Sequence, residues 1–256
     1  KQLYTALIER RNLNQAAAIH CTTPQEAEDL RNFGIQTPPI ILPLGVEQPE
    51  FIPTAKSELY DVFNIPKSRL IILFLSRLHY KKRPDLLINA LNEIVSQNHN
   101  IHLIMAGNGE AEYTTYLKQL VHQHHLADYV NFPGFITGRA KEILFQGSDI
   151  FALPSYSENF GIAVAEAMVA GLPVIVTTGI QIAPEIAAAN AGIVIKRDTE
   201  FIGAINRLLN SETLRSRLSK NAMELASQKY AWKEIASQLI CSYKDIIGNS
   251  GAKNLP

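Results

Sequence analysis

The chain has 256 residues, of which 46% are hydrophobic, a composition typical of a globular protein that buries a core. Its 24 basic and 24 acidic side chains give a formal net charge of zero. This balance argues against a nucleic-acid binder, because phosphate-driven affinity needs many uncompensated cations on one surface. No apolar run reaches the roughly 18 residues of a membrane span and no signal peptide is recognisable, so we expect a cytoplasmic protein.

Short apolar runs alternate along the chain with segments of helical periodicity. This alternation predicts an α/β fold with a parallel sheet covered on both faces. Eight runs predict strands, at residues 16–21, 39–44, 70–75, 101–106, 129–132, 149–153, 173–177 and 192–195. Leu, Ile and Ala recur at helical intervals in residues 84–97, 110–125, 139–146, 160–170, 199–209, 211–227 and 231–247.

The segment between the second and third predicted strands, residues 45–66, is rich in Gly, Pro and polar residues. This composition interrupts regular structure and predicts a linker, so we place a domain boundary between residues 50 and 51. The six later strands are enough for one doubly wound parallel sheet, Rossmann-like, over residues 51–256. The two earlier strands cannot close a core alone, so they form either an extra layer or the end of a neighbouring domain.

Residues 155–173 predict a loop, a helix and a turn between two strands. Ser157 or Asn159 is expected to cap the start of the helix, and Gly171 to end it in the left-handed conformation. The helix follows the carboxyl end of a strand, the edge where open α/β sheets bind ligands. We expect the N–H groups of the first helical residues to face an anion such as a phosphate. These residues are Phe160, Gly161 and Ile162.

Two glutamates in this segment are candidate ligand-binding residues. Glu166 lies in an apolar turn with no basic residue three or four positions away. It either occupies a partly exposed helix face or accepts hydrogen bonds from ligand hydroxyls. Glu158 lies eight residues earlier, about 12 Å along an ideal helix. Carboxylates that far apart cannot share a proton, so we expect them to contact two parts of one extended ligand.

A basic loop follows the strand predicted at residues 70–75. It contains Arg77, Lys81, Lys82 and Arg83, four cations within seven residues. Such a loop is either a solvated basic surface or a clamp for an anion, and Arg with Lys is a common pair for binding a diphosphate. Its position at the carboxyl edge of the sheet favours the clamp.

Gly107 and Gly109 follow the strand predicted at residues 101–106, as in a dinucleotide-binding fingerprint. The third glycine of that fingerprint is absent, because Glu112 stands in its place. We therefore predict a tight turn from strand to helix and no NAD site.

We expect neither a metal site nor a structural disulfide. His122, His124 and His125 are spaced so that three imidazoles do not point at one position. Cys21 and Cys241 lie near opposite ends of the chain without metal-binding spacing, which indicates two reduced thiols.

Together these motifs resemble those of family 4 glycosyltransferases, retaining enzymes with the two-domain GT-B fold. The match runs from Ala16 to the end of the chain and corresponds to the C-terminal half of such enzymes. Its most specific element is the Glu-x7-Glu motif from Glu158 to Glu166. The other matching motifs, in the family's order, are the Arg77 and Lys82 pair, the Gly-x-Gly turn that begins at Gly107, and the Pro-Gly-Phe-Ile segment that ends at Ile136.

The resemblance implies that the chain binds a nucleotide-diphosphate sugar, with a UDP-sugar favoured. Arg77 and Lys82, together with the amides of Gly161 and Ile162, would hold the diphosphate and stabilise the leaving nucleotide in place of a metal. No cofactor is implied. Retention of configuration would follow from attack by an acceptor hydroxyl on the same face of the sugar.

The resemblance also assigns residues to the sugar and the nucleoside. Glu158 would contact the sugar ring near the reacting carbon, and Glu166 the ribose hydroxyls. The backbone of Ile136 would bind the edge of the base, with Lys141 alongside. One departure is Arg83, which replaces a frequent glycine after the lysine. Another is Asn159, which replaces a common glycine after the first glutamate, and we expect these changes to alter sugar choice and to leave the phosphate clamp intact.

Members of this family have an N-terminal acceptor domain, and residues 1–50 correspond to its end and the linker. The helix after Trp232 normally crosses back toward that domain. We therefore expect the chain to supply the donor site for transfer to an unknown hydroxyl acceptor, in polysaccharide or glycolipid synthesis, but to transfer sugar poorly alone. Two alternatives remain, a nucleotide-binding subunit without transferase activity and a GT-B sugar-nucleotide epimerase. Peripheral association with the inner face of a membrane also remains open.

Overall fold

The computed structural model describes residues 8–97 and 100–252 and contains two compact units. The first unit comprises Lys1–Gly45 and Gln228–Pro256, and the second comprises Val46–Ser227. The expected domain division, residues 1–50 and 51–256, stays a prediction, because compactness alone does not show which part folds on its own.

The second unit is built on a six-stranded parallel sheet with the strand order β5-β4-β3-β6-β7-β8. The strands are β3 (Leu70–Leu75), β4 (Ile101–Ala106), β5 (Val130–Gly134), β6 (Ile150–Leu153), β7 (Val174–Thr177) and β8 (Gly192–Ile195). The direction of strand addition reverses between β3 and β6, as in a doubly wound sheet. The predicted α/β fold with a doubly wound parallel sheet is confirmed.

The core of this unit lies on both sides of its central strands. All residues of β4 and β6 are buried, and so are the four inner residues of β3. Continuous apolar runs are expected where a strand is covered on both faces. This burial is why the period-two alternation of a half-exposed strand is missing from the sequence.

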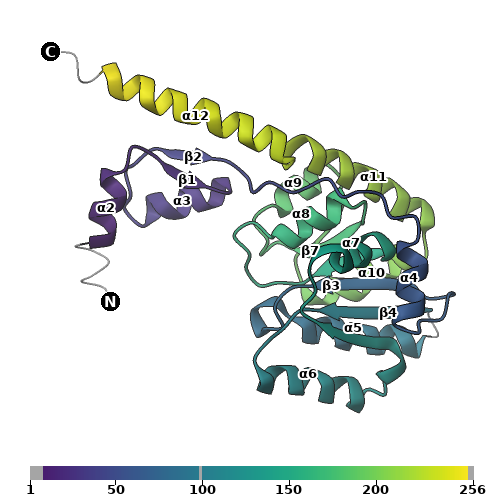
Figure 1. The fold of residues 1–256 in the computed structure, drawn as a ribbon. Helices are drawn as coiled ribbons and strands as arrows, with labels where there is room; N and C mark the ends of the chain where they lie inside the picture. Colours follow the sequence, from purple (N-terminus) through teal and green to yellow (C-terminus); the bar gives the residue numbers. More distant parts are fainter. Residues whose placement is uncertain (1–7, 98–99, 253–256) are drawn as a thin grey trace. The chain divides into compact units, whose positions relative to one another are not determined.

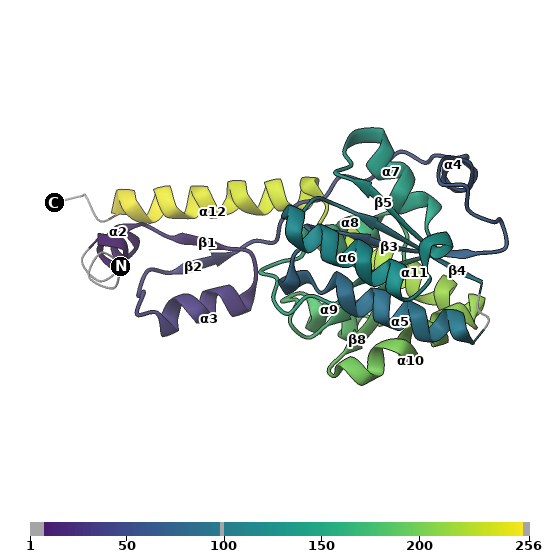
Figure 2. The ribbon, with the colours of Figure 1, turned by 90° about the horizontal axis from the view of Figure 1, so that it is seen from below.

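Helices cover both faces of the sheet (Figures 1 and 2). Helix α5 (Pro84–Ser96) packs against α6 (Ala111–Gln123) and α10 (Phe201–Leu209), whereas α7 (Gly138–Gly147) packs against α4 (Ala55–Val62). Helices α8 (Ile162–Val169) and α9 (Ala183–Ala188) also belong to the unit, as does most of α11 (Glu212–Lys229). Short 3-10 turns occur at Tyr80–Lys82, Ala127–Tyr129 and Asp198–Glu200.

Helix α4 lies within residues 45–66, where the sequence predicted a linker without regular structure. That prediction was wrong, because Pro53 and Pro66 flank the helix instead of interrupting it. The helix packs closely on α7 at Gly147, where an added Cβ would lie 2.7 Å from the carbonyl oxygen of Ala55. An ion pair between Lys56 of α4 and Asp149, directly before β6, also holds the helix against the sheet.

The first unit contains a two-stranded parallel sheet of β1 (Ile19–Cys21) and β2 (Pro39–Ile41). Within the described residues, its α-helices are α2 (Arg10–Gln15), α3 (Pro24–Asn32) and α12 (Trp232–Ala252). Gly45 contacts Trp232 so closely that an added Cβ would lie 2.4 Å from the indole ring. Across residues 8–97 and 100–252, no helix has both the length and the hydropathy that crossing a membrane requires.

Candidate functional site

The predicted site residues follow the carboxyl ends of β3, β4, β5 and β6. Because the strands are parallel, these ends share one edge of the sheet. Strands β3 and β6 are neighbours at the point where the strand order reverses. Open α/β sheets bind their ligands at such a switch point, because the connections on either side leave in opposite directions and open a crevice.

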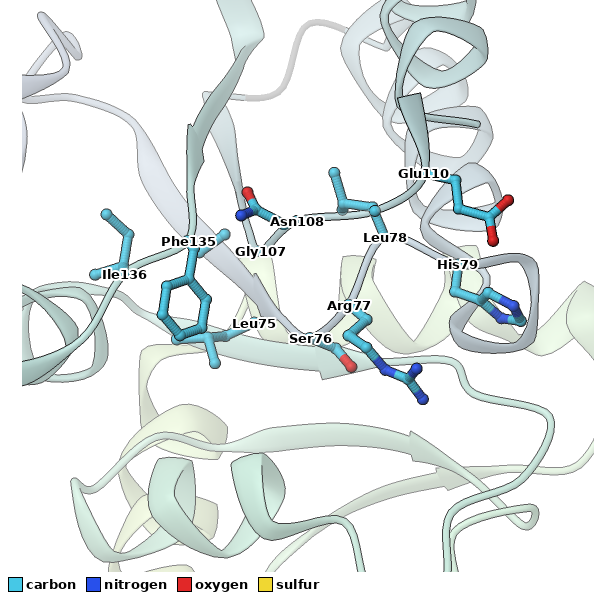
Figure 3. A pocket seen from close by; sticks show the side chains of 12 residues that line it. Leu75, Ser76, Arg77, Leu78, His79, Gly107, Asn108, Glu110, Phe135 and Ile136 are labelled. Atoms are coloured by element: carbon cyan, nitrogen blue, oxygen red, sulfur yellow. The ribbon is translucent and has the colours of Figure 1, made fainter. Parts of the chain in front are cut away.

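A pocket of about 450 Å³ opens at this edge. Figure 3 shows that its lining comes from the segments after three neighbouring strands, β3, β4 and β5. Arg77, Gly107 and Ile136 are the predicted site residues in that lining. The Arg77 side chain is exposed. Phe135, which precedes Ile136 in the sequence, is 71% exposed and also lines the pocket.

The Gly-x-Gly turn after β4 packs directly against the loop after β3. Gly107 has a φ of +140°, and a Cβ added to it would lie 1.9 Å from the carbonyl oxygen of Ser76. A Cβ on Gly109 would lie 2.1 Å from the carbonyl oxygen of Leu78. The Leu78 amide donates to the Asn108 carbonyl over 2.9 Å. The glycines therefore allow two backbones to touch and hold the loop that carries Arg77.

Lys82 and Glu158, the two predicted residues at the switch point, form an ion pair between Nζ and Oε1. Only 12% of the lysine side chain and 15% of the glutamate side chain are exposed. The Glu158 backbone is fixed as well, because its amide donates to the Gly179 carbonyl over 3.0 Å and its carbonyl accepts from the Gln181 amide over 3.1 Å. The structure thus joins the basic loop to the first glutamate of the motif.

Two further hydrogen bonds connect the same two loops. The carbonyl oxygen of Lys81 accepts from the Tyr156 amide over 2.8 Å and from the Ser155 hydroxyl over 3.0 Å. Ser155 is fully buried, so the connection is shielded from water. The loops after β3 and β6 therefore form one hydrogen-bonded layer at the edge of the sheet.

Glu166 is paired with Lys141, a residue of α7, over 2.8 Å between Nζ and Oε1. The two side chains are 26% and 32% exposed, respectively. The sequence showed no basic partner on the helix of Glu166 itself, and the partner comes from another helix. This pairing supplies the charge compensation that a half-buried carboxylate requires.

The start of α8 differs from the prediction. Its N-cap is Gly161, with a φ of +87°, and no side chain caps the helix. The expectation that Ser157 or Asn159 would cap it was wrong, because the chain turns sharply at the glycine and the helix begins only at Ile162. The Phe160 side chain is buried and anchors this turn. The end of the helix follows the prediction, since Gly171 has a φ of +85°.

Arg83 carries a buried charge at this edge, and nothing in the sequence distinguishes it from the other cations of the basic loop. Arg83 was counted among the cations of the basic loop, yet it is only 8% exposed and is bonded to Asp198 through both terminal guanidinium nitrogens, Nη1 and Nη2. These hydrogen bonds hold the pKa of the Asp198 carboxyl below its ordinary value. The two residues are 115 positions apart, and no sequence pattern pairs them.

Comparisons with known proteins agree with this geometry. Residues 56–225 match the sequence model of the family described as glycosyl transferases group 1. An uncharacterized glycosyltransferase of Methanocaldococcus jannaschii is 33% identical over 176 residues, which are 68% of this chain and 44% of that protein. A D-inositol 3-phosphate glycosyltransferase of Stackebrandtia nassauensis is 26% identical over 251 residues, which are 93% of this chain and 56% of that protein.

Among solved structures, HepE of Anabaena in complex with UDP and glucose has a TM-score of 0.86 to this chain at 20% identity. The likeness covers 96% of this chain and 68% of HepE, and at this identity it shows the fold alone. The chain spans about half the length of the curated relatives described above. Because the family model matches more than half of its residues, the chain belongs to the group 1 glycosyl transferases, and its sheet unit has the fold of the C-terminal domain of GT-B enzymes.

Proposed function

We propose that this chain provides the donor site of a retaining glycosyltransferase that moves a hexose from a UDP-sugar to an acceptor hydroxyl. The observation that carries the proposal is the meeting of Lys82 and Glu158 at the switch point of the sheet. Lys82 is a cation that can bind a diphosphate, and Glu158 is a carboxylate that can bind sugar hydroxyls. The two form one ion pair, and Arg77 lies in the same loop as Lys82.

The diphosphate is held by positive groups of this chain, without a metal. The exposed Arg77 guanidinium can approach it from the pocket, and the Lys82 ammonium from the switch point. The first turn of α8 adds backbone N–H groups whose partial positive charge favours an anion. These groups stabilise the charge that develops on the leaving nucleotide, which is the main contribution expected from an electrostatic site.

The transfer exchanges one bond of the anomeric carbon for another. The bond to the acceptor oxygen forms as the bond to the diphosphate oxygen breaks, and the electron pair of the broken bond leaves with the nucleoside diphosphate. The acceptor proton passes to the leaving diphosphate, so that atoms and charge balance. Glu158 contacts the sugar hydroxyls near the reacting carbon, and same-face attack retains the configuration.

The nucleoside occupies the other side of the site. Glu166, oriented by Lys141, accepts hydrogen bonds from the ribose hydroxyls. The backbone of Ile136 binds the edge of the base, and the exposed ring of Phe135 lies next to it in the pocket lining. The preference for uridine is supported by HepE, a protein of the same fold that was solved with UDP.

Calorimetry with UDP, GDP and UDP-glucose tests this proposal. We expect Arg77→Ala to weaken UDP binding about tenfold, because a charge-assisted contact to phosphate is lost. Glu158→Gln is expected to weaken UDP-glucose binding more than UDP binding, since its contact is to the sugar. Arg197→Ala, which removes an exposed ion pair with Glu200, is the control and should change neither affinity.

Two results would separate the proposal from its alternatives. If Arg77→Ala leaves UDP and GDP affinity unchanged and Glu158→Gln leaves UDP-glucose affinity unchanged, the assigned site is wrong. If the affinities fall as expected but the full-length protein neither transfers nor hydrolyses a UDP-sugar, the chain is a nucleotide-binding subunit without transferase activity.

A further inference from the structure

Arg83 has a backbone conformation that is unusual for an arginine. It follows Lys82 directly and forms the N-cap of α5 with φ 56° and ψ 47°, in the left-handed region. A residue with a side chain occupies this region at a cost in free energy, and glycine is the residue that avoids that cost. Arginine at this position therefore needs interactions that offset the strain.

The Arg83 side chain makes such interactions with two other loops. Its Nη1 donates to Asp198 Oδ1 over 2.7 Å, and its Nη2 pairs with Asp198 Oδ2. The guanidinium carbon also lies 4.3 Å from the ring centroid of Tyr156. A planar guanidinium suits both contacts, because it matches the two oxygens of a carboxylate and stacks on an aromatic face.

These contacts connect three strands of the sheet at their carboxyl ends. Arg83 follows β3, Tyr156 follows β6, and Asp198 follows β8. Lys82 directly precedes Arg83, and Glu158 lies two residues after Tyr156. Lys82 and Glu158 are themselves an ion pair. The Arg83 side chain, only 9% exposed, therefore fixes the turn that presents Lys82 and the loop that presents Glu158.

We propose that Arg83 is a positioning residue of the donor site, which holds the Lys82 ammonium in place for the diphosphate by bonding to Asp198 and stacking on Tyr156. This inference rests on the proposed function, because Lys82 must bind phosphate for its position to matter. Arg83 itself does not touch the ligand in this role, since its Nη1 and Nη2 bond to Asp198 and its guanidinium plane stacks on the Tyr156 ring.

The test measures the affinity of the full chain for UDP by calorimetry in a double-mutant cycle. Arg83→Gly removes the side chain but keeps the left-handed backbone without strain, and we expect it to weaken UDP binding about tenfold. In the Lys82→Ala background, the same substitution should change the affinity less than twofold, because Arg83 acts through Lys82. A general loosening of the protein would weaken binding equally in both backgrounds and would overturn the proposal.

Asp198→Asn provides a second variant that is mild for folding, because the Asp198 side chain is 58% exposed. It weakens the contact from the other side, and we expect about a threefold loss of UDP affinity. Only a small decrease in the thermal unfolding temperature is expected, because the asparagine amide oxygen still accepts a hydrogen bond from the Arg83 guanidinium. Arg197→Gly is the matched control. Arg197 directly precedes Asp198 but pairs with Glu200, so its removal should leave UDP binding unchanged.

The outcomes distinguish this inference from the proposed function. If Lys82→Ala and Arg77→Ala leave UDP affinity unchanged, the donor site is wrongly placed and both fail. If Lys82→Ala weakens binding but Arg83→Gly and Asp198→Asn do not, the donor site stands and the positioning role is refuted. Should Arg83→Gly fail to fold, Asp198→Asn alone decides, and an affinity within twofold of the wild type refutes the role.

Discussion

Lys141 Nζ lies 2.8 Å from Glu166 Oε1, so a carboxylate in an apolar turn of α8 is paired with a cation from α7. Both side chains remain partly exposed. One carboxylate oxygen of Glu166 is thereby engaged, while a carboxylate has lone pairs on both oxygens. The pair can keep its geometry and still accept hydrogen bonds from a ligand.

This arrangement predicts that Glu166 contributes to the binding of UDP but not to the binding of inorganic pyrophosphate. We expect Glu166→Gln to weaken UDP binding about fivefold, because a charged acceptor for the ribose hydroxyls becomes neutral. Binding of inorganic pyrophosphate should stay unchanged, whereas Arg77→Ala should weaken both ligands. Calorimetric titration of the two variants with UDP and pyrophosphate measures the contrast. An equal loss for both ligands in Glu166→Gln would place this residue at the diphosphate instead.

The close packing at the Gly-x-Gly turn predicts a large effect of a single methyl group. Gly107→Ala should lower the free energy of unfolding by about 2–4 kcal/mol, because the new Cβ would overlap the Ser76 carbonyl. Urea unfolding of the full chain measures this loss. Gly203→Ala is the control, since nothing lies within 4 Å of a Cβ there and the site is an exposed position of α10. That control should gain about 0.5–1 kcal/mol from helix propensity. Equal stability of Gly107→Ala and the wild type would contradict the packing role.

The buried strands were the easiest features to predict from sequence. The buried strands β3 and β4 have the predicted bounds, because continuous apolar runs flanked by polar residues are a strong local signal. The edge strand β8, which is only partly buried, also has the predicted bounds. Helix α9 was missed, since its six residues are too few for a helical period to be recognised. Helix α4 was missed because prolines at the ends of a short helix look the same in sequence as prolines that break one.

The site was predictable to the level of its loops, but not of its contacts. Parallel strands bring their carboxyl ends to one edge, so residues after β3 and β6, such as Lys82 and Glu158, were expected to converge. The ion pair between Arg83 and Asp198 depends on how the loop after β8 approaches that edge. This approach is a property of tertiary packing, and the local sequence around Arg83 indicates only a basic loop.

The ion pair between Lys82 and Glu158 predicts a measurable contribution to stability. Lys82→Met leaves the largely buried Glu158 carboxylate without its partner, and we expect a loss of about 2 kcal/mol in the free energy of unfolding. The double variant Lys82→Met/Glu158→Gln should recover most of that loss, because the remaining side chain is neutral. Urea titrations of the full chain measure both values.

An exposed ion pair offers the comparison for this experiment. Arg139 lies 3.6 Å from Glu58, and the two side chains are 68% and 36% exposed. Arg139→Met should therefore cost less than about 0.5 kcal/mol. If Lys82→Met costs no more than this control, the pair at the switch point is not a significant source of stability.

His102 predicts a dependence of stability on pH. It lies in β4 with only 3% exposure, its Nε2 is 2.6 Å from Asn131 Oδ1, and within the described part of the chain its buried Nδ1 has no hydrogen-bond partner. Burial lowers the pKa of this imidazole, and the hydrogen bond to Asn131 offsets only part of that effect. The folded protein thus keeps His102 neutral at a pH where the unfolded chain binds a proton.

The sign follows from proton linkage. Below the ordinary histidine pKa of about 6.5, the unfolded state gains a proton that the folded state does not, so the free energy of unfolding falls as the pH decreases. The contribution is fully present above that value and is lost as the pH falls toward the lower folded pKa. We expect the free energy of unfolding of the wild type to fall more between pH 7.5 and pH 5 than that of His102→Gln, which stays neutral. His122→Gln, at an exposed position of α6, should behave like the wild type. Urea unfolding at the two pH values decides, and the same loss in His102→Gln as in the wild type would show that another group carries the dependence.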